Sequence, residues 1–257
     1  MKEGWDPDVY LRYEGYRARP ALDLIEQIPL DIEGDIVDLG CGPGNVTKRL
    51  KDTWPDRAVT GVDKSEAMLT KARDSYPDIT WELGDMSTWT AETPKALVFS
   101  NAALHWITNH EEVVPRLMDA IKPGGWLAFQ IPVTEESGYQ ICLRATVHSE
   151  RWAEKLSNVW MYKNPMDPGP FYDLLTPAST SVDIWVTDYH HVLEGKNPVV
   201  DWIMGTGLTP YLAVLDEAEK AEFMADYRGQ VLEAYPKQGD GKTLFLMKRI
   251  FVLAQKA

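Results

Sequence analysis

The stretch IVDLGCGPGNVTKRL, residues 36–50, decides the fold of this chain. It starts as an apolar run typical of a buried strand, passes through Gly40, Gly42 and Gly44, and ends in a helix-like pattern. Glycine has no Cβ, so these positions can adopt positive φ and let backbone amides approach a ligand. A plain turn between a strand and a helix rarely needs three glycines. The stretch therefore predicts a strand, a ligand-binding loop and a helix.

Strand-like and helix-like patterns alternate from residue 35 to residue 131. Short apolar runs predict five strands, at 35–39, 58–63, 79–83, 96–101 and 126–131. Apolar residues spaced three and four apart predict helices between them, at 45–54, 65–76 and 110–121. Strands that alternate with helices indicate an α/β fold with a doubly wound, Rossmann-like sheet.

The alternation breaks down after residue 131. Two long strand patterns remain, at 181–193 and 244–254, which bring the expected sheet to about seven strands. Helical patterns cover 136–156, 197–212 and 217–235, and residues 164–170 are typical of a loop. We therefore expect a single domain over 1–257. Within it, 1–34 forms an N-terminal lid or helix, 35–132 a cofactor-binding core, and 133–257 a helical cap on the acceptor side with the last two strands.

The composition limits the function and the location of the protein. Twenty-six basic and 39 acidic residues give a formal net charge of −13, which argues against binding to nucleic acid or to an anionic membrane. The two cysteines, Cys41 and Cys142, form no zinc pattern, and a structural disulfide is not expected. No stretch has the pattern of a signal peptide or of a membrane span. These features predict a cytoplasmic protein.

The loop and the strand that follows it indicate the chemistry of the ligand. Dinucleotide sites usually read G-x-G-x-x-G, whereas this loop reads G-x-G-x-G and contains Pro43, which lacks an amide for a diphosphate. Asp63 ends the second strand 19 residues beyond Gly44, where a carboxylate accepts ribose hydroxyls. Asp38 brings a second carboxylate to the loop. Two carboxylates favour a nucleoside that carries a positive charge.

An ordered set of motifs extends this pattern: VDLGCGPG, GVD, GDM, FSNAALHW and IKPGGWLAFQIP, over residues 36–132. The set resembles the class I S-adenosylmethionine-dependent methyltransferases. The resemblance implies S-adenosylmethionine as cofactor and S-adenosylhomocysteine as product. It places Asp38, Gly40, Gly42 and Gly44 along the cofactor, Asp63 at the ribose with Lys64 beside it, and Asp85 and Met86 at the adenine. It also places Asn101 and Ala102 near the methionine and the transferred methyl group.

Segments outside this set resemble the trans-aconitate 2-methyltransferase family, namely YLRYEGYRARPALDLI, NAALHWITNHEEVVPRL, VDIWVTDYHHVL, DWIMGTGLTPYL and KRIFVLAQ. This resemblance covers nearly the whole chain. It implies methyl transfer to a carboxylate of a small polycarboxylic acid, most simply trans-aconitate, with a monomethyl ester as product. One departure concerns the acid: where family members tend to carry an arginine between the leucine and proline of GLTP, this chain has Thr209.

Such a reaction needs little from the protein beyond binding. A carboxylate is already ionised at pH 7, so neither a general base nor a metal is required, and the rate comes from alignment and the exclusion of water. A polycarboxylate does require cations and donors. The candidate substrate-binding residues are Tyr10, Tyr13, Arg17, Arg19, Trp106, His190, Tyr211 and Arg249. Arg17 and Arg19 can instead pair with nearby carboxylates, and His190 can be structural. Arg249 interrupts an apolar strand, which favours a pocket or an ion pair.

Three other functions remain open from the sequence. A methyltransferase acting on a phenol, an amine or a carbon acid would need a base, for which Asn101 and His105 are the nearby polar candidates. A nicotinamide-dependent oxidoreductase is disfavoured by the loop spacing and Pro43. A non-catalytic protein that retained the cofactor fold would bind without turnover. The sequence does not fix the oligomeric state.

Overall fold

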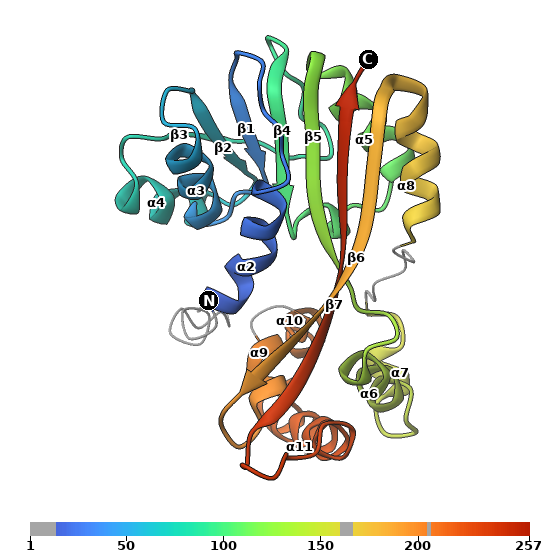
Figure 1. The fold of residues 1–257 in the computed structure, drawn as a ribbon. Helices are drawn as coiled ribbons and strands as arrows, with labels where there is room; N and C mark the ends of the chain where they lie inside the picture. Colours follow the sequence, from blue (N-terminus) through green and yellow to red (C-terminus); the bar gives the residue numbers. More distant parts are fainter. Residues whose placement is uncertain (1–13, 160–166, 205–206) are drawn as a thin grey trace. The chain divides into compact units, whose positions relative to one another are not determined.

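The computed structural model describes residues 14–159, 167–204 and 207–257. The chain divides into two compact units, each built from separate stretches of sequence. We call them the core unit (17–132, 164–187 and 249–257) and the cap unit (1–16, 133–163 and 188–248). Figure 1 traces their elements along the chain.

One sheet of seven strands, in the order β3-β2-β1-β4-β5-β7-β6, organises the fold (Figure 1). The strands are β1 (Ile36–Leu39), β2 (Val59–Asp63), β3 (Thr80–Leu83), β4 (Lys95–Asn101), β5 (Ile121–Val133), β6 (Ser179–Leu193) and β7 (Thr243–Lys256). Strands β1 to β5 pair in parallel. Strand β7 runs antiparallel to β5, because Gln255 donates to Gly124 near the start of β5 while Arg249 donates to Gln130 near its end. The predicted doubly wound sheet of about seven strands is confirmed.

Helices of the core unit follow the strands as the sequence pattern predicts. They are α2 (Glu14–Ile25, whose first three residues belong to the cap unit), α3 (Asn45–Thr53), α4 (Glu66–Ser75), the 3₁₀ turn η1 (Leu104–Trp106), α5 (His110–Asp119), α8 (Pro168–Leu175) and the 3₁₀ turn η2 (Thr176–Ala178). Ser65 caps α4 by accepting a hydrogen bond from the Met68 amide. Helix α3 contacts β2, helix α4 contacts both β2 and β3, and α5 contacts α8.

Helix α8 corrects one expectation from the sequence. Residues 164–170 were expected to form a loop, yet the helix begins at Pro168. Proline fits the first position of a helix because its fixed φ suits the helix and its missing amide hydrogen would have no partner there. Asp167 caps the helix by accepting a hydrogen bond from the Gly169 amide at 2.9 Å. The proline-rich segment therefore starts a helix.

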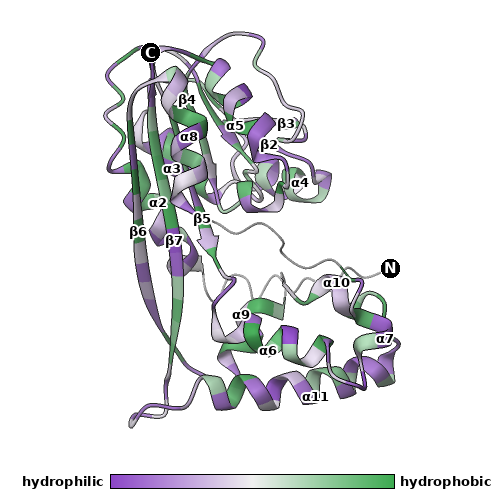
Figure 2. Cartoon of the chain, turned by 90° about the vertical axis from the view of Figure 1, so that its right-hand side faces the viewer, coloured by the Kyte–Doolittle hydropathy of each residue, from purple (hydrophilic) through white to green (hydrophobic). Residues whose placement is uncertain are grey.

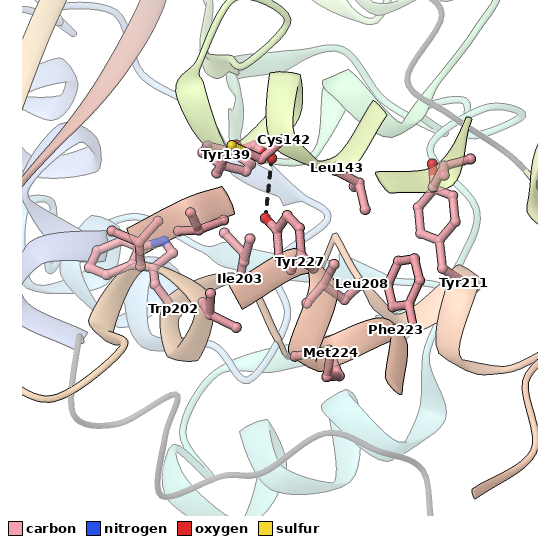
Figure 3. Close-up of a cluster of buried hydrophobic side chains, with 14 of the residues drawn as sticks. Tyr139, Cys142, Leu143, Trp202, Ile203, Leu208, Tyr211, Phe223, Met224 and Tyr227 are labelled. Atoms are coloured by element: carbon pink, nitrogen blue, oxygen red, sulfur yellow. Dashed lines mark hydrogen bonds between the residues drawn. The ribbon is translucent and has the colours of Figure 1, made fainter. Parts of the chain in front are cut away.

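The cap unit combines helices with residues 188–193 of β6 and residues 243–248 of β7. Its helices are α6 (Gly138–Val147), α7 (Ala153–Leu156), α9 (Pro198–Met204), α10 (Thr209–Leu212) and α11 (Glu217–Ala234). The helical pattern at 136–156 is thus two helices, and the pattern at 197–212 also contains two helices within its described part. A cluster of buried side chains holds the cap together (Figure 3). In it the Tyr227 hydroxyl donates to the Tyr139 carbonyl oxygen at 3.2 Å.

Buried and exposed side chains alternate along the part of β6 in the cap unit, and α11 has both buried and exposed side chains. Tyr189, His191 and Leu193 are buried on β6, whereas the residues between them are exposed. Helix α11 alternates between hydrophobic and hydrophilic residues (Figure 2), and Phe223 and Tyr227 supply part of its buried face. Among the described helices, none is both long enough and apolar enough to span a membrane.

Candidate active site

The loop after β1 has the backbone shape that its glycines predict. Gly40, Gly42 and Gly44 have φ values of +74°, +56° and +86°. A Cβ at Gly40 would overlap the Ala103 side chain, and a Cβ at Gly44 would overlap the ring of Trp81. A Cβ at Gly42 would meet no atom within 4 Å. Packing therefore accounts for the glycines at 40 and 44, while Gly42 leaves open space beside the loop.

Asp63, at the end of β2, holds this loop in place. Its Oδ2 accepts a hydrogen bond from the Gly42 amide at 2.8 Å, and its Oδ1 accepts one from the Ser65 amide at 2.8 Å. A carboxylate can accept about four hydrogen bonds, so each oxygen retains a lone pair for a ligand hydroxyl. The residue predicted to bind ribose thus also joins the loop after β1 to the end of β2.

Asp38 is the buried charge of the site. Its side chain lies in β1 with 1% of the residue exposed. Thr47 donates to Oδ2 at 2.6 Å, whereas within the described residues no donor reaches Oδ1. Burial raises the pKa of Asp38 to about 7; Thr47 opposes the rise and the charge of Asp63 adds to it. A buried carboxylate with one open oxygen fits a cationic ligand, because a positive charge would stabilise its ionised form.

Residues after β3 line the loop from another side. Met86 is half-buried; its Sδ lies 3.9 Å from the Ser100 hydroxyl, and its Cε comes close to Gly40. Asp85 is exposed and accepts a hydrogen bond from the Ser87 amide at 2.8 Å; the Ser87 side chain and then this amide lower the pKa of its carboxyl group. Lys64 is also exposed. The structure therefore brings Met86 to the loop and leaves the side chains of Asp85 and Lys64 at the surface.

Polar side chains, two of them buried and one half-buried, meet at the end of β4. Asn101 accepts a hydrogen bond from the side-chain amide of Gln130, its register partner on β5. Arg249 on β7, 5% exposed, donates to Gln130 Oε1 at 3.4 Å. We call Asn101, Gln130 and Arg249 the polar array. Ala102 follows with a φ of +50°, the one positive value outside glycine in the described part of the chain, and donates its amide to the Gln130 carbonyl at 2.9 Å.

His105 lies in the 3₁₀ turn η1, close enough to Arg249 of the polar array to be affected by its charge. It is buried, and burial lowers its pKa to about 3, with further lowering by the charges of Arg249 and His110. The imidazole is therefore neutral at pH 7. Trp106, next in the chain, is 42% exposed, and its ring centroid lies 4.9 Å from that of His105.

The remaining candidate residues lie in different surroundings. Arg17 is half-buried on α2, and Arg19 is exposed with its Nε 3.9 Å from the Asp23 carboxylate. His190 is exposed on β6. Tyr211 is buried in the cap cluster (Figure 3), where burial raises its pKa to about 12. Thr209 is exposed at the start of α10, and Tyr10 and Tyr13 lie outside the described residues.

Three residues of the site were not singled out from the sequence. Thr47 binds Asp38, the Trp81 ring lies against Gly44, and Gln130 joins β4 to β7. Only Gln130 has a visible signal, since it is a polar residue inside the apolar run WLAFQIP. The other two depend on contacts across the sheet.

The chain is similar in sequence to known methyltransferases. A family model described as a methyltransferase domain matches residues 36–125. Curated proteins named trans-aconitate 2-methyltransferase match nearly the whole chain. The protein from Variovorax paradoxus is 41% identical over 254 residues, which cover 98% of each chain. The protein from Methylobacterium radiotolerans is 39% identical over 256 residues, again covering 98% of each chain.

Solved structures share the fold at low sequence identity. The YcgJ protein of Bacillus subtilis aligns with a TM-score of 0.59 at 12% identity, covering 93% of this chain and 98% of that one. A Haemonchus contortus phosphoethanolamine N-methyltransferase, solved with S-adenosylhomocysteine, aligns with a TM-score of 0.55 at 14% identity, covering 93% of this chain and 53% of that one.

Proposed function

The chain belongs to the trans-aconitate 2-methyltransferase family, and we propose that it transfers the methyl group of S-adenosylmethionine to a carboxylate of trans-aconitate. The products are the monomethyl ester and S-adenosylhomocysteine. The observation that carries this proposal is the identity of about 40% to the named relatives over 98% of the chain. Both cysteines are free and buried, which suits a reducing compartment such as the cytoplasm.

The residues of the loop fit S-adenosylmethionine. When bound, the cofactor supplies an electrophilic methyl group on a sulfonium. Asp38, with its open Oδ1, stabilises the cationic part of the cofactor. Asp63 accepts hydrogen bonds from the ribose hydroxyls with the lone pairs that the two amides leave free. Met86, close to Gly40, would provide an apolar contact for the adenine. The Asp85 carboxylate would accept a hydrogen bond from the adenine amino group.

The polar array supplies the charge that an acidic acceptor needs. Arg249 is a permanent cation in a buried position, and guanidinium groups bind carboxylates in a defined planar geometry. The carboxylate is the nucleophile as it stands, so the protein only has to align one of its oxygens with the methyl group and exclude water. His105 is neutral at pH 7, so it adds no positive charge to that of Arg249 at the acceptor site.

The rest of the predicted acceptor site is part of the same proposal. Arg17, Arg19, Trp106, His190 and Tyr211, with Tyr10 and Tyr13 outside the described residues, remain candidates to bind or enclose the acid. Thr209 is uncharged and cannot form an ion pair with a carboxylate of the acid. Residue 209 is therefore the position to vary when testing which acid is methylated.

A panel of acids tests the proposal. Purified protein is incubated with labelled S-adenosylmethionine and trans-aconitate, cis-aconitate, citrate, isocitrate or itaconate, and kcat/KM is measured for each acid. We expect the highest kcat/KM with trans-aconitate and a product whose label is released by alkali, as for an ester. Turnover of another acid at ten times the trans-aconitate rate would reassign the substrate. Cofactor binding without turnover of any acid would refute the activity.

A replacement of Arg249 tests the acceptor site within the same assay. Arg249→Met removes the charge while keeping a long apolar side chain, and we expect KM for trans-aconitate to rise at least tenfold. Arg73→Met is the matched control, because Arg73 is exposed on α4, pairs there with Glu66 at 2.6 Å and is not among the candidates for the acceptor site. An unchanged KM in the Arg249 variant would remove Arg249 from the acceptor site.

A further inference from the structure

Gln130 occupies an unusual place for a polar side chain. It lies near the end of β5 with 1% of its surface exposed, between the buried apolar residues Phe129 and Ile131. Its backbone carbonyl accepts the Ala102 amide, and its side chain bonds to both neighbouring strands. A buried amide in such a position needs partners for its donor and its acceptor.

The direction of these hydrogen bonds follows from Arg249. A guanidinium group can only donate, so the side-chain oxygen of Gln130 must face Arg249. The NH₂ group of Gln130 then faces the other way and donates to the side-chain oxygen of Asn101. With its oxygen engaged by Gln130, Asn101 has its own NH₂ group left to donate. The charge of Arg249 therefore fixes the orientation of two successive amides.

We propose that Gln130 is a positioning residue, which orients Asn101 so that the site presents N–H donors to the acceptor. The proposal rests on the proposed function, because a donor at Asn101 stabilises a carboxylate. A phenol or alcohol that must lose a proton would need an acceptor at this place. Gln130 acts through Asn101 and need not contact the substrate.

The proposal predicts which kinetic constant changes. The acceptor carboxylate carries a full negative charge before the reaction and loses it as the ester forms. Donors therefore stabilise the bound substrate more than the transition state, so their loss raises KM and leaves kcat unchanged or slightly higher. A variant that merely destabilises the fold would instead lose active protein and lower the apparent kcat.

Gln130→Glu is the first test. The new carboxylate has the same shape and still accepts from Arg249, but it cannot donate to Asn101. Asn101 then turns its NH₂ group toward residue 130 and presents its oxygen to the acceptor. We expect KM for trans-aconitate to rise at least tenfold, with kcat changed less than threefold. A KM within twofold of the wild-type value would overturn the proposal.

Gln255→Glu is the matched control. Gln255 on β7 is half-buried, donates to the Gly124 carbonyl at 3.2 Å and accepts from the Thr180 hydroxyl at 3.1 Å, so it has the same hydrogen-bonding pattern near the other end of β5. We expect its KM for trans-aconitate to match that of the wild type. A KM that rises equally in both variants would show that any added carboxylate has this effect, and would overturn the proposal.

A double-mutant cycle covers the case in which Gln130→Glu does not fold. Gln130→Met is uncharged and similar in size, and Asn101→Ala removes the group that Gln130 orients. We expect Gln130→Met to raise KM tenfold in the wild-type background and less than threefold in the Asn101→Ala background. Equal effects in both backgrounds would overturn the proposal. If the wild-type protein methylates no acid, the proposed function fails; if it methylates trans-aconitate and the cycle is additive, only the role of Gln130 fails.

Discussion

At the scale of single residues, the site depends on charged groups held away from water. Asp38 and Arg249 are both buried in the core unit, one beside the loop after β1 and the other in the polar array. Burying a charge without compensation costs several kcal/mol, so such groups persist where a ligand or partner stabilises them. Asp38 and Arg249 have opposite signs, matching a cationic cofactor and an anionic acceptor.

The raised pKa of Asp38 predicts a pH-dependent cofactor affinity. A cationic ligand binds the ionised carboxylate, so below the free-protein pKa of about 7 binding must first remove a proton. We expect the Kd for S-adenosylmethionine to be about tenfold higher at pH 6 than at pH 8, with proton release detected by calorimetry in buffers of different ionisation heat. Asp38→Asn should bind more weakly and lose the dependence. A Kd that falls at pH 6 would contradict this role.

His105 predicts acid sensitivity of the fold. Its pKa is about 3 when folded and near 6.5 when unfolded, so between these values only the unfolded chain takes up the proton. The stability contribution is therefore present above pH 6.5 and is lost as the pH falls. At pH 5 the loss is about 2 kcal/mol. The raised pKa of Asp38 acts in the opposite direction, so the test compares variants: between pH 7.5 and pH 5, urea unfolding should show a change in stability about 2 kcal/mol less favourable in the wild type and in the exposed-histidine control His148→Gln than in His105→Gln. Equal changes in all three would contradict it.

The sequence shows the arrangement of the loop after β1 more directly than that of the polar array, for a physical reason. Gly40 to Gly44 and Asp63 lie in one short βαβ unit, where spacing along the chain determines position in space. The polar array joins residues from β4, β5 and β7, and its bonds depend on strand register. The pair His190 and His191 shows the same limit. His191 is buried, with its ring centroid 4.9 Å from that of Trp202, whereas His190 is exposed. Because the two residues are identical and adjacent, the sequence does not show which of them is buried.

At the scale of elements, helix α3 depends on the loop that precedes it. Gly44 is the residue before the helix, in the left-handed conformation at φ +86°, and the Trp81 ring from β3 fills the space where a Cβ would be. The start of α3 and the position of β3 are therefore coupled through one glycine.

Replacement of two glycines by alanine tests this coupling. Gly44→Ala forces an unfavourable φ and an overlap with Trp81, and we expect about 2 kcal/mol of lost stability and at least tenfold weaker cofactor binding. Gly229→Ala, inside α11, meets open space and should stabilise the protein by about 0.5–1 kcal/mol. Denaturant unfolding and calorimetry give both values. Similar stability of the two variants would contradict the account.

The elements themselves were predicted where their pattern is strong. Strands β1 to β4 and helices α3 to α5 agree with the expected ranges to within two residues, because buried parallel strands and amphipathic helices have distinct periods. Strand β5 was expected at 126–131 but begins at Ile121, so it includes the Pro-Gly-Gly sequence that was expected only to end the preceding helix. Helix α8 was missed because its first three residues, Pro168, Gly169 and Pro170, look like a loop, although a proline can begin a helix.

At the scale of the whole molecule, the two units are interleaved along the chain. The cap unit takes its residues from three stretches, and both β6 and β7 pass from one unit into the other. The alternation of a strand is a local property, so the sequence does not show where a strand leaves one unit and enters the next. The expected N-terminal lid (1–34) remains a prediction, and residues 1–13 lie outside the described part.

Limited proteolysis tests the lid. We expect S-adenosylhomocysteine with trans-aconitate to slow tryptic cleavage after Arg17 severalfold compared with the free protein, because closure over both ligands would order this segment. S-adenosylhomocysteine alone should give an intermediate rate, and cleavage after the half-buried Lys220 in the first turn of α11 serves as the internal reference. Identical rates in all samples would rule out ligand-dependent closure.

The most direct test of the central claim is the identity of the product. The protein is incubated with S-adenosylmethionine carrying a ¹³C-labelled methyl group and trans-aconitate, and the product is examined by NMR and mass spectrometry. We predict one labelled O-methyl group whose protons correlate with a carboxyl carbon of aconitate, formed in equal amount to S-adenosylhomocysteine. A label found on any atom other than a carboxylate oxygen, or no transfer while the cofactor is bound, would contradict the account.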